Sequence, residues 1–189
     1  MSINSQSNGQ HVAAPASPLT PLNSPAQLPV AKSPRRAPED SGRYRLHVVA
    51  TNIADVVTSI GGLIVDRAMA GWDVTVALDG HRRGAIDDRP IRILGASVAT
   101  APSGPHVLAV ATDVFVANEP VRRLAVAARS GNTADVLLWG RRHPPNLNCR
   151  FVPVRHRLSA AAQAFKSHAL AARGPVAAEL TEEGFYSMG

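Results

Sequence analysis

The segment from Tyr44 to Gly80 constrains the fold more than any other part of the chain. It contains an apolar strand over 45–50, an amphipathic helical stretch, and a second apolar strand over 73–78. Asn52 can cap the helix, and Asp55 lies three residues later, where a carboxylate reaches back to the first turn. Because two strands joined by one helical crossover lie parallel, the segment predicts a right-handed βαβ unit.

The remaining elements extend this pattern. We expect further strands over 91–94, 134–139 and 151–154, helices over 120–129 and 158–172, and an apolar stretch over 106–116 that fits either type. The unalternated run that contains Leu137 and Leu138 predicts a central strand with both leucines buried. Pro153 cannot donate to a ladder, so its strand belongs near a sheet edge. Alternating strands and helices predict an α/β fold with a small doubly wound, mostly parallel sheet, either Rossmann-like or, as the alternative, flavodoxin-like.

Composition divides the 189 residues into three parts. Residues 1–43 are rich in Pro and Ser and have no aromatic residue, which predicts a disordered tail. Residues 44–173 form the expected Rossmann-like domain, and 174–189 form an acidic C-terminal tail that we expect to be loose. There is no apolar run long enough for a bilayer, and no secretory signal pattern, so we expect a cytoplasmic protein without membrane partners. The oligomeric state stays open.

The formal net charge of +6 raises the possibility of nucleic-acid binding. Only Lys32 and Lys166 among the twenty basic residues are lysines, a bias typical of a GC-rich genome. Trp72 and Trp139 flank strands and are expected in the core, so the sequence offers no surface aromatics on which single strands stack. Nucleic acid is therefore a possible but not a favoured partner.

The common nucleotide-binding fingerprints are missing. The turn after the first strand, 50–53, has no glycine, where a dinucleotide fold has a Gly-rich turn. Gly61 and Gly62 lie within the helical stretch and indicate close packing rather than a phosphate cradle. No P-loop and no Gly-x-Ser-x-Gly elbow occurs. These absences disfavour a standard NAD or ATP site and leave the cofactor unknown.

Two resemblances add to this interpretation. The turn 51–54, followed by a helix and 71–76, resembles the opening of FMN-dependent flavoproteins of the pantothenate-cysteine decarboxylase type, although Asn52 stands where that family has Gly. The segments 66–72, 137–140 and 165–170 resemble an uncharacterised family of Rossmann-like proteins from high-GC bacteria. The second resemblance spans 44–173 and implies no activity.

Polar and basic residues follow the predicted strands directly. In a parallel sheet ligands bind beyond the carboxyl ends of the strands. The candidate ligand-binding residues at this edge are Thr51, Asn52, Asp79, His81, Arg82, Arg141, His143, Arg155 and His156. The basic members predict a positive field there, and together with the start of the last helix they predict an anion site.

No catalytic residue can be assigned from the sequence. The spacing of His81, His143 and His156 does not indicate a metal site, and Cys149 is the sole cysteine, which excludes an internal disulfide. The favoured hypothesis is a non-catalytic binding or regulatory module for a small anionic ligand, such as a nucleotide or phosphorylated metabolite. The alternatives are an enzyme of nucleotide, flavin or sugar-phosphate chemistry with an atypical loop, and a nucleic-acid-binding protein.

Overall fold

The computed structural model describes residues 42–80, 87–99, 104–140, 149–172 and 181–189. The strands in these ranges are β1 (Arg45–Ala50), β2 (Asp73–Leu78), β3 (Ser97–Val98), β4 (Val107–Ala111), β5 (Asp135–Trp139), β6 (Phe151–Arg157) and β7 (Glu182–Met188). The helices are α1 (Ile53–Ser59), α2 (Gly61–Met69), α3 (Arg89–Ile93), α4 (Thr112–Ala117), α5 (Glu119–Ser130) and α6 (Ala160–Ala171).

The strands form one mixed sheet with the order β3-β2-β1-β4-β5-β7-β6. β1 pairs in parallel with β2 and β4, and β4 pairs in parallel with β5. β7 is antiparallel to both of its neighbours, β5 and β6. The predicted α/β fold with a mostly parallel sheet is therefore confirmed. The chain moves outward from β1 to β3 and returns to β4 on the other side of β1, so the topological switch point lies between β1 and β4.

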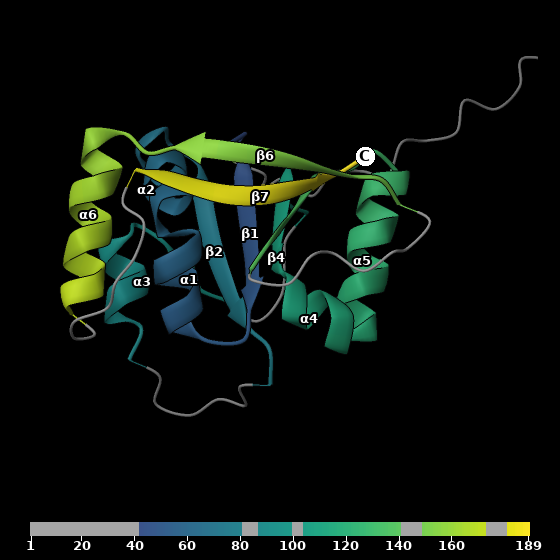
Figure 1. Cartoon of the computed structure of the whole chain (residues 1–189), viewed down its shortest axis with the longest axis horizontal. Coiled ribbons are helices and arrows are strands. Elements are labelled where there is room, and N and C mark those ends of the chain that lie inside the picture. The colour runs from purple at the N-terminus through teal and green to yellow at the C-terminus, as the bar shows by residue number, and fades with distance from the viewer. Residues whose placement is uncertain (1–41, 81–86, 100–103, 141–148, 173–180) are drawn as a thin grey trace, which may run out of the picture. The chain divides into compact units, whose positions relative to one another are not determined.

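Helices pack on either side of the sheet, as Figure 1 shows. α1, α2, α3 and α6 contact one another and form one layer, whereas α4 and α5 lie together on the other side. β6 and β7 cross the view of Figure 1 at a steep angle to β1 and β2, so the sheet is strongly twisted. β6 ends the strand order, which confirms the edge position expected from Pro153.

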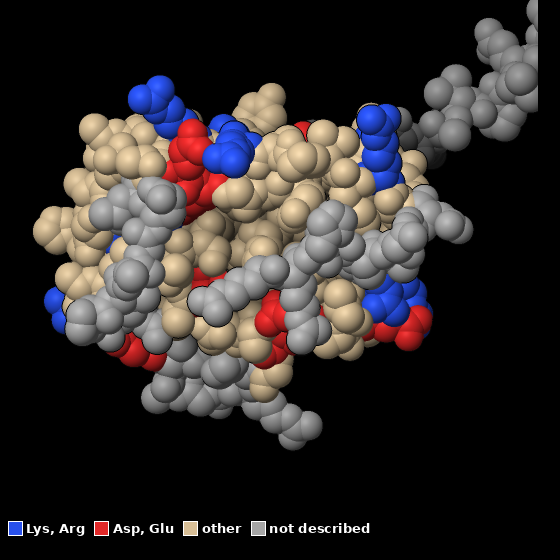
Figure 2. Space-filling view, viewed as in Figure 1, with Lys and Arg blue, Asp and Glu red and all other residues tan. Residues whose placement is uncertain are grey.

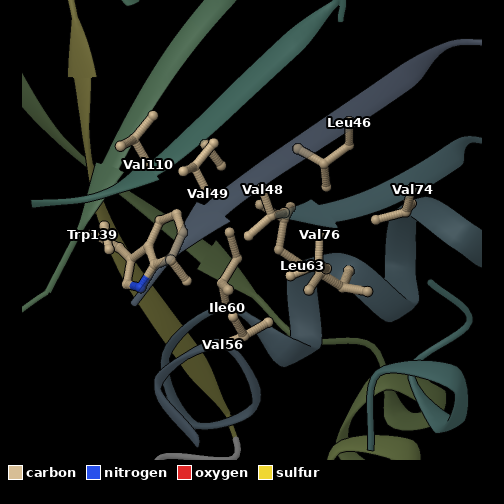
Figure 3. Close-up of a cluster of buried hydrophobic side chains, with 14 of the residues drawn as sticks. Leu46, Val48, Val49, Val56, Ile60, Leu63, Val74, Val76, Val110 and Trp139 are labelled. Carbon is tan, nitrogen blue, oxygen red and sulfur yellow. The ribbon is translucent and has the colours of Figure 1, made fainter. Parts of the chain in front are cut away.

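Part of the core lies between the sheet and the α1–α2 layer (Figure 3), and Phe115 of α4 and Ala125 of α5 are buried in the same core cluster. Val48 of β1, Ile60 between the helices and Val76 of β2 are all fully buried there. On β5, Leu138 is fully buried, while Leu137 is only partly buried. The expectation that both leucines are buried is thus confirmed for Leu138, whereas Leu137 is only partly buried.

The helical stretch between β1 and β2 is divided, where the sequence predicts one long helix. Ile60 has φ −134° and ψ 2°, which ends α1 and precedes α2. The backbone N–H groups of Gly62 and Leu63, at the start of α2, donate to the two carboxylate oxygens of Glu183 at 2.7 and 2.9 Å. A carboxylate 120 residues away along the chain thus satisfies the helix start that the break creates.

Two further predictions are wrong. Residues 91–94 lie in or directly after helix α3, which has Pro90 at its first turn, rather than in a strand. Residues 182–188 form strand β7 within the sheet, where a loose acidic tail is expected. The sequence misleads because Glu182 and Glu183 gain their partners only from distant segments. The predicted disordered segment 1–43 falls almost entirely outside the described residues.

In the described part of the chain, no helix combines the length and the apolar character that crossing a bilayer requires.

Candidate functional site

A hydrogen bond bridges the switch point of the sheet. Thr51 directly follows β1, and Asp113 lies in the first turn of α4, directly after β4. The Thr51 hydroxyl Oγ1 donates to Asp113 Oδ2 at 2.7 Å, and both residues are exposed to solvent. The Asp113 carboxylate also accepts the backbone N–H of Val114 through Oδ1 at 2.9 Å. An oriented carboxylate therefore lies where open α/β sheets bind their ligands.

A second pair forms beside the first. Asp79 directly follows β2, and its Oδ1 accepts a hydrogen bond from Asn118 Nδ2 at 2.7 Å. The amide oxygen of Asn118 caps α5 by accepting the N–H of Val121 at 3.1 Å. Because Asn118 connects α4 to α5, the segment after β4 contacts the ends of both β1 and β2.

Asp55 lies on the first turn of α1, the helix that follows β1 after a short loop. The buried Trp139, the last residue of β5, donates its indole Nε1–H to Asp55 Oδ2 at 3.2 Å. Ser59 donates to Asp55 Oδ1 at 2.9 Å, and Asn52 caps the helix by accepting the Asp55 N–H at 2.9 Å. The predicted cap at Asn52 is confirmed. Trp139 is buried as expected, and its ring nitrogen connects β5 to α1.

Thr112 and Gly140 complete the edge between β4 and β5. Thr112 is buried, and its hydroxyl donates to the carbonyl of Trp139 at 2.8 Å. Gly140 follows with φ +129°, a conformation that a side chain rarely adopts. The chain thus turns sharply as it leaves β5, directly beside the start of α4.

The described part of this edge carries acidic side chains. Asp55, Asp79 and Asp113 all lie at or next to the carboxyl ends of the parallel strands. Figure 2 shows acidic side chains at the surface in the lower half of the view, the side on which β1 and β2 end in Figure 1. The positive field expected here depends on His81, Arg82, Arg141 and His143, which lie outside the described residues.

Arg155 and His156 lie elsewhere. Both belong to β6, which runs to Arg157 rather than ending at 154. The exposed Arg155 pairs with Glu182 of β7 at 2.9 Å. His156 contacts Asp66, which lies in the second half of α2; this helix runs antiparallel to β1, so Asp66 is near the amino edge of the sheet. The structure therefore brings Thr51, Asn52 and Asp79 to one edge but not Arg155 and His156.

A carboxylate of the protein itself contacts the start of α6. Ser159 caps this helix, and its hydroxyl donates to Asp66 Oδ1 at 2.5 Å, while its N–H donates to Oδ2 at 3.3 Å. His156 Nε2 lies 2.8 Å from the same Oδ2. Burial alone raises the pKa of Asp66, but the hydrogen bonds from Ser159 and His156 together hold it below its usual value. The sequence predicts a bound anion at the start of this helix. In the structure the carboxylate of Asp66 supplies the negative charge there.

Within the described ranges, no group of three His, Cys, Asp or Glu side chains is arranged to hold a metal ion. Asp55, Asp113 and Asn118 are the site residues that sequence reasoning does not place there. Two of them had a signal: Asp113 comes two residues after an apolar strand, and Asn118 precedes a Glu-Pro helix start. The role of Asp55 beside Trp139 has no sequence signal, because 84 residues separate the two.

Comparisons with known proteins bear on the fold of the chain. A scan of the sequence against protein-family models finds no match, and a search of curated proteins finds none either. The A40926 pseudoaglycone deacetylase Dbv21 superposes with a TM-score of 0.55 at 12% identity, covering 78% of this chain and 98% of that chain.

Two deacetylase structures from teicoplanin biosynthesis are also similar. The complex with teicoplanin has a TM-score of 0.53 at 11% identity and covers 76% of this chain and 97% of that chain. The deacetylase–bog complex has a TM-score of 0.52 at 11% identity and covers 77% of this chain and 98% of that chain. At these identities the likeness concerns the course of the backbone alone, and the chain shares its α/β fold with these deacetylases.

Proposed function

We propose that this protein is a hydrolase of small, polar, acylated molecules, with its active site at the carboxyl edge of the sheet. The observation that carries the proposal is the Thr51–Asp113 hydrogen bond across the switch point between β1 and β4. Ligands of open α/β sheets bind at such a point. The shared fold with deacetylases favours removal of an acyl group as the reaction.

Asp113 is the candidate general base. Its carboxylate is exposed, and one oxygen is oriented by the Thr51 hydroxyl while the other accepts the Val114 N–H. In the proposed reaction Asp113 accepts a proton from a water molecule, and the water oxygen attacks the acyl carbonyl carbon. The bond from that carbon to the amine or alcohol then breaks, and the leaving group takes up the proton. In this proposal Asp79 and Asn118 bind hydroxyl or amino groups of the substrate.

Binding without turnover is the second candidate function. It is favoured by the fact that each edge carboxylate already accepts a hydrogen bond from the protein: Asp55 from Trp139, Asp79 from Asn118, and Asp113 from Thr51. A carboxylate that the protein holds in one orientation in this way can bind a ligand without taking part in a reaction. In this role the carboxyl edge of the sheet holds a small ligand. The sequence predicts an anionic ligand, which Arg82 and Arg141 would bind.

Release of acetate from a panel of N-acetylated amino sugars and small acetate esters tests the proposal. We expect the purified full-length chain to hydrolyse at least one compound. Asp113→Asn should lower kcat/KM by about 100-fold or more, in the range of a lost general base. Thr51→Val should lower it less, because the carboxylate remains and only its orientation is lost.

The matched control is Asp135→Asn, the same change at the first residue of β5, on the opposite edge of the sheet. Its activity should equal that of the wild type. If Asp113→Asn and Asp135→Asn had equal kcat/KM, Asp113 would not be the base. Ligand-induced stabilisation without release of acetate would instead identify the protein as a binding module.

A further inference from the structure

Four side chains form a layered cluster at the amino edge of the sheet. Tyr44 directly precedes β1, Trp72 directly precedes β2, and their rings stack at 5.1 Å with an interplanar angle of 25°. The Arg67 guanidinium lies over the Trp72 ring at 4.7 Å. His106, directly before β4, meets the Tyr44 ring edge-on at 5.0 Å. Strands of one parallel sheet begin at a common edge, so the fold assembles this cluster from three separate segments.

The cluster is an exposed aromatic surface in a fixed orientation. Tyr44 is 59% exposed, although it is stacked on Trp72 and contacted by His106. The His106 ring is itself held, because its Nδ1 accepts the Arg45 backbone N–H at 3.1 Å. A tyrosine that is fixed by neighbours loses little conformational entropy when a planar group stacks on it. The sequence places Trp72 in the core and predicts no surface aromatic; the structure leaves Trp72 only partly buried and Tyr44 at the surface.

The charge around this surface fits a phosphate-bearing partner. Arg43 is exposed and immediately precedes Tyr44, and the guanidinium of Arg67 lies over the Trp72 ring. The acidic residues at this edge are the exposed Asp73 and Asp135, at the starts of β2 and β5, and Asp66, which is held by Ser159 and His156. The whole chain carries a net charge of +6, so the long-range field attracts polyanions.

We propose that the surface formed by Tyr44, Trp72 and Arg67 binds single-stranded nucleic acid, with one base stacked on Tyr44 and neighbouring phosphates near Arg43 and Arg67. Aromatic rings beside basic side chains are the usual means of binding single strands without sequence preference. This surface is at the amino edge of the sheet, whereas the proposed hydrolase site is at the carboxyl edge. A negative result for one proposal therefore leaves the other proposal unaffected.

Fluorescence polarisation of a labelled single strand of about 16 nucleotides, a length within the usual site size, measures the affinity of the full-length chain. We expect Tyr44→Ala to weaken binding by between about 5-fold and 150-fold, the equivalent of one lost base stack. Arg67→Gln should weaken binding and reduce the slope of log affinity against log salt, because one phosphate contact is lost. Intrinsic tryptophan fluorescence should change on binding in the wild type, since Trp72 underlies Tyr44.

Phe165→Ala is the matched control, because Phe165 is an exposed aromatic residue on α6, 44% exposed, outside the cluster. It should bind like the wild type. Equal affinities of the Tyr44→Ala and Phe165→Ala variants, both folded by circular dichroism, would overturn the proposal. So would complete competition by a mononucleotide at concentrations equal to those of the strand, because the site would then hold a single nucleotide and not a strand.

Discussion

The ammonium of Lys166 on α6 lies 2.8 Å from Glu183 Oε1 on β7, and both side chains are almost completely buried. The same carboxylate accepts the N–H groups of Gly62 and Leu63 at the start of α2. Glu183 therefore joins the C-terminal strand to two helices of one layer. Within this pair each side chain carries the counter-charge of the other, away from solvent.

Removal of one partner should be strongly destabilising. We expect Lys166→Met to lower the free energy of unfolding by about 3–5 kcal/mol, because it leaves a carboxylate buried without its counter-ion. Urea denaturation followed by circular dichroism measures the change. The neighbouring pair Arg155–Glu182 is the control, since its side chains are 80% and 45% exposed. Arg155→Gln should change the stability by less than about 1 kcal/mol. Similar losses for the two variants would contradict the role of burial.

Gly62 gives the second prediction. A Cβ at this position would collide with the side chain of Leu158, including its Cγ, which cannot move without the backbone or a rotamer change. Gly62→Ala should therefore cost about 1–3 kcal/mol of stability. Gly61→Ala is the control in the same helix, because its Cβ would meet Leu94 and Lys166 at an ordinary 3.5 Å. If thermal unfolding ranked the two alanine variants in the reverse order, the packing of α2 against Leu158 would be incorrect.

The third prediction concerns His47 in the middle of β1. It is 2% exposed, and its Nδ1 lies 2.7 Å from Thr75 Oγ1 on β2. Burial lowers the pKa of His47 from 6.5 to about 4. The unfolded chain therefore binds a proton at a higher pH than the folded chain does. The free energy of unfolding is therefore unaffected by this residue above pH 6.5. It decreases as the pH falls toward 4, by roughly 3 kcal/mol in total.

Unfolding free energies at intervals between pH 7 and pH 4 test this prediction. His47→Gln should remove most of the pH dependence in that window, because glutamine does not titrate. Asp66, whose pKa is lowered from 3.8, acts in the same direction, but most of its effect develops below pH 4 and only its onset falls at the acid end of the window. Parallel pH profiles for the wild type and His47→Gln would show that the folded chain accepts a proton at His47 without cost.

The sequence alone determines the fold class, since apolar strands that alternate with amphipathic helices have few ways to bury their apolar faces. It also places Thr51, Asn52 and Asp79 at one edge, because parallel strands end together. Local patterns suffice for such features: a cap at Asn52 or an edge strand at Pro153 depends only on neighbours along the chain.

Only the tertiary structure decided the rest, because the deciding partners are distant in sequence. Glu183 becomes a core residue and β7 a strand of the sheet through Lys166 and the start of α2, so an acidic C-terminal segment is buried. Asp113 reaches Thr51 because β4 returns beside β1. Tyr44 stacks on Trp72 because β1 and β2 begin at the same edge, which places an aromatic ring at the surface that no local pattern indicates.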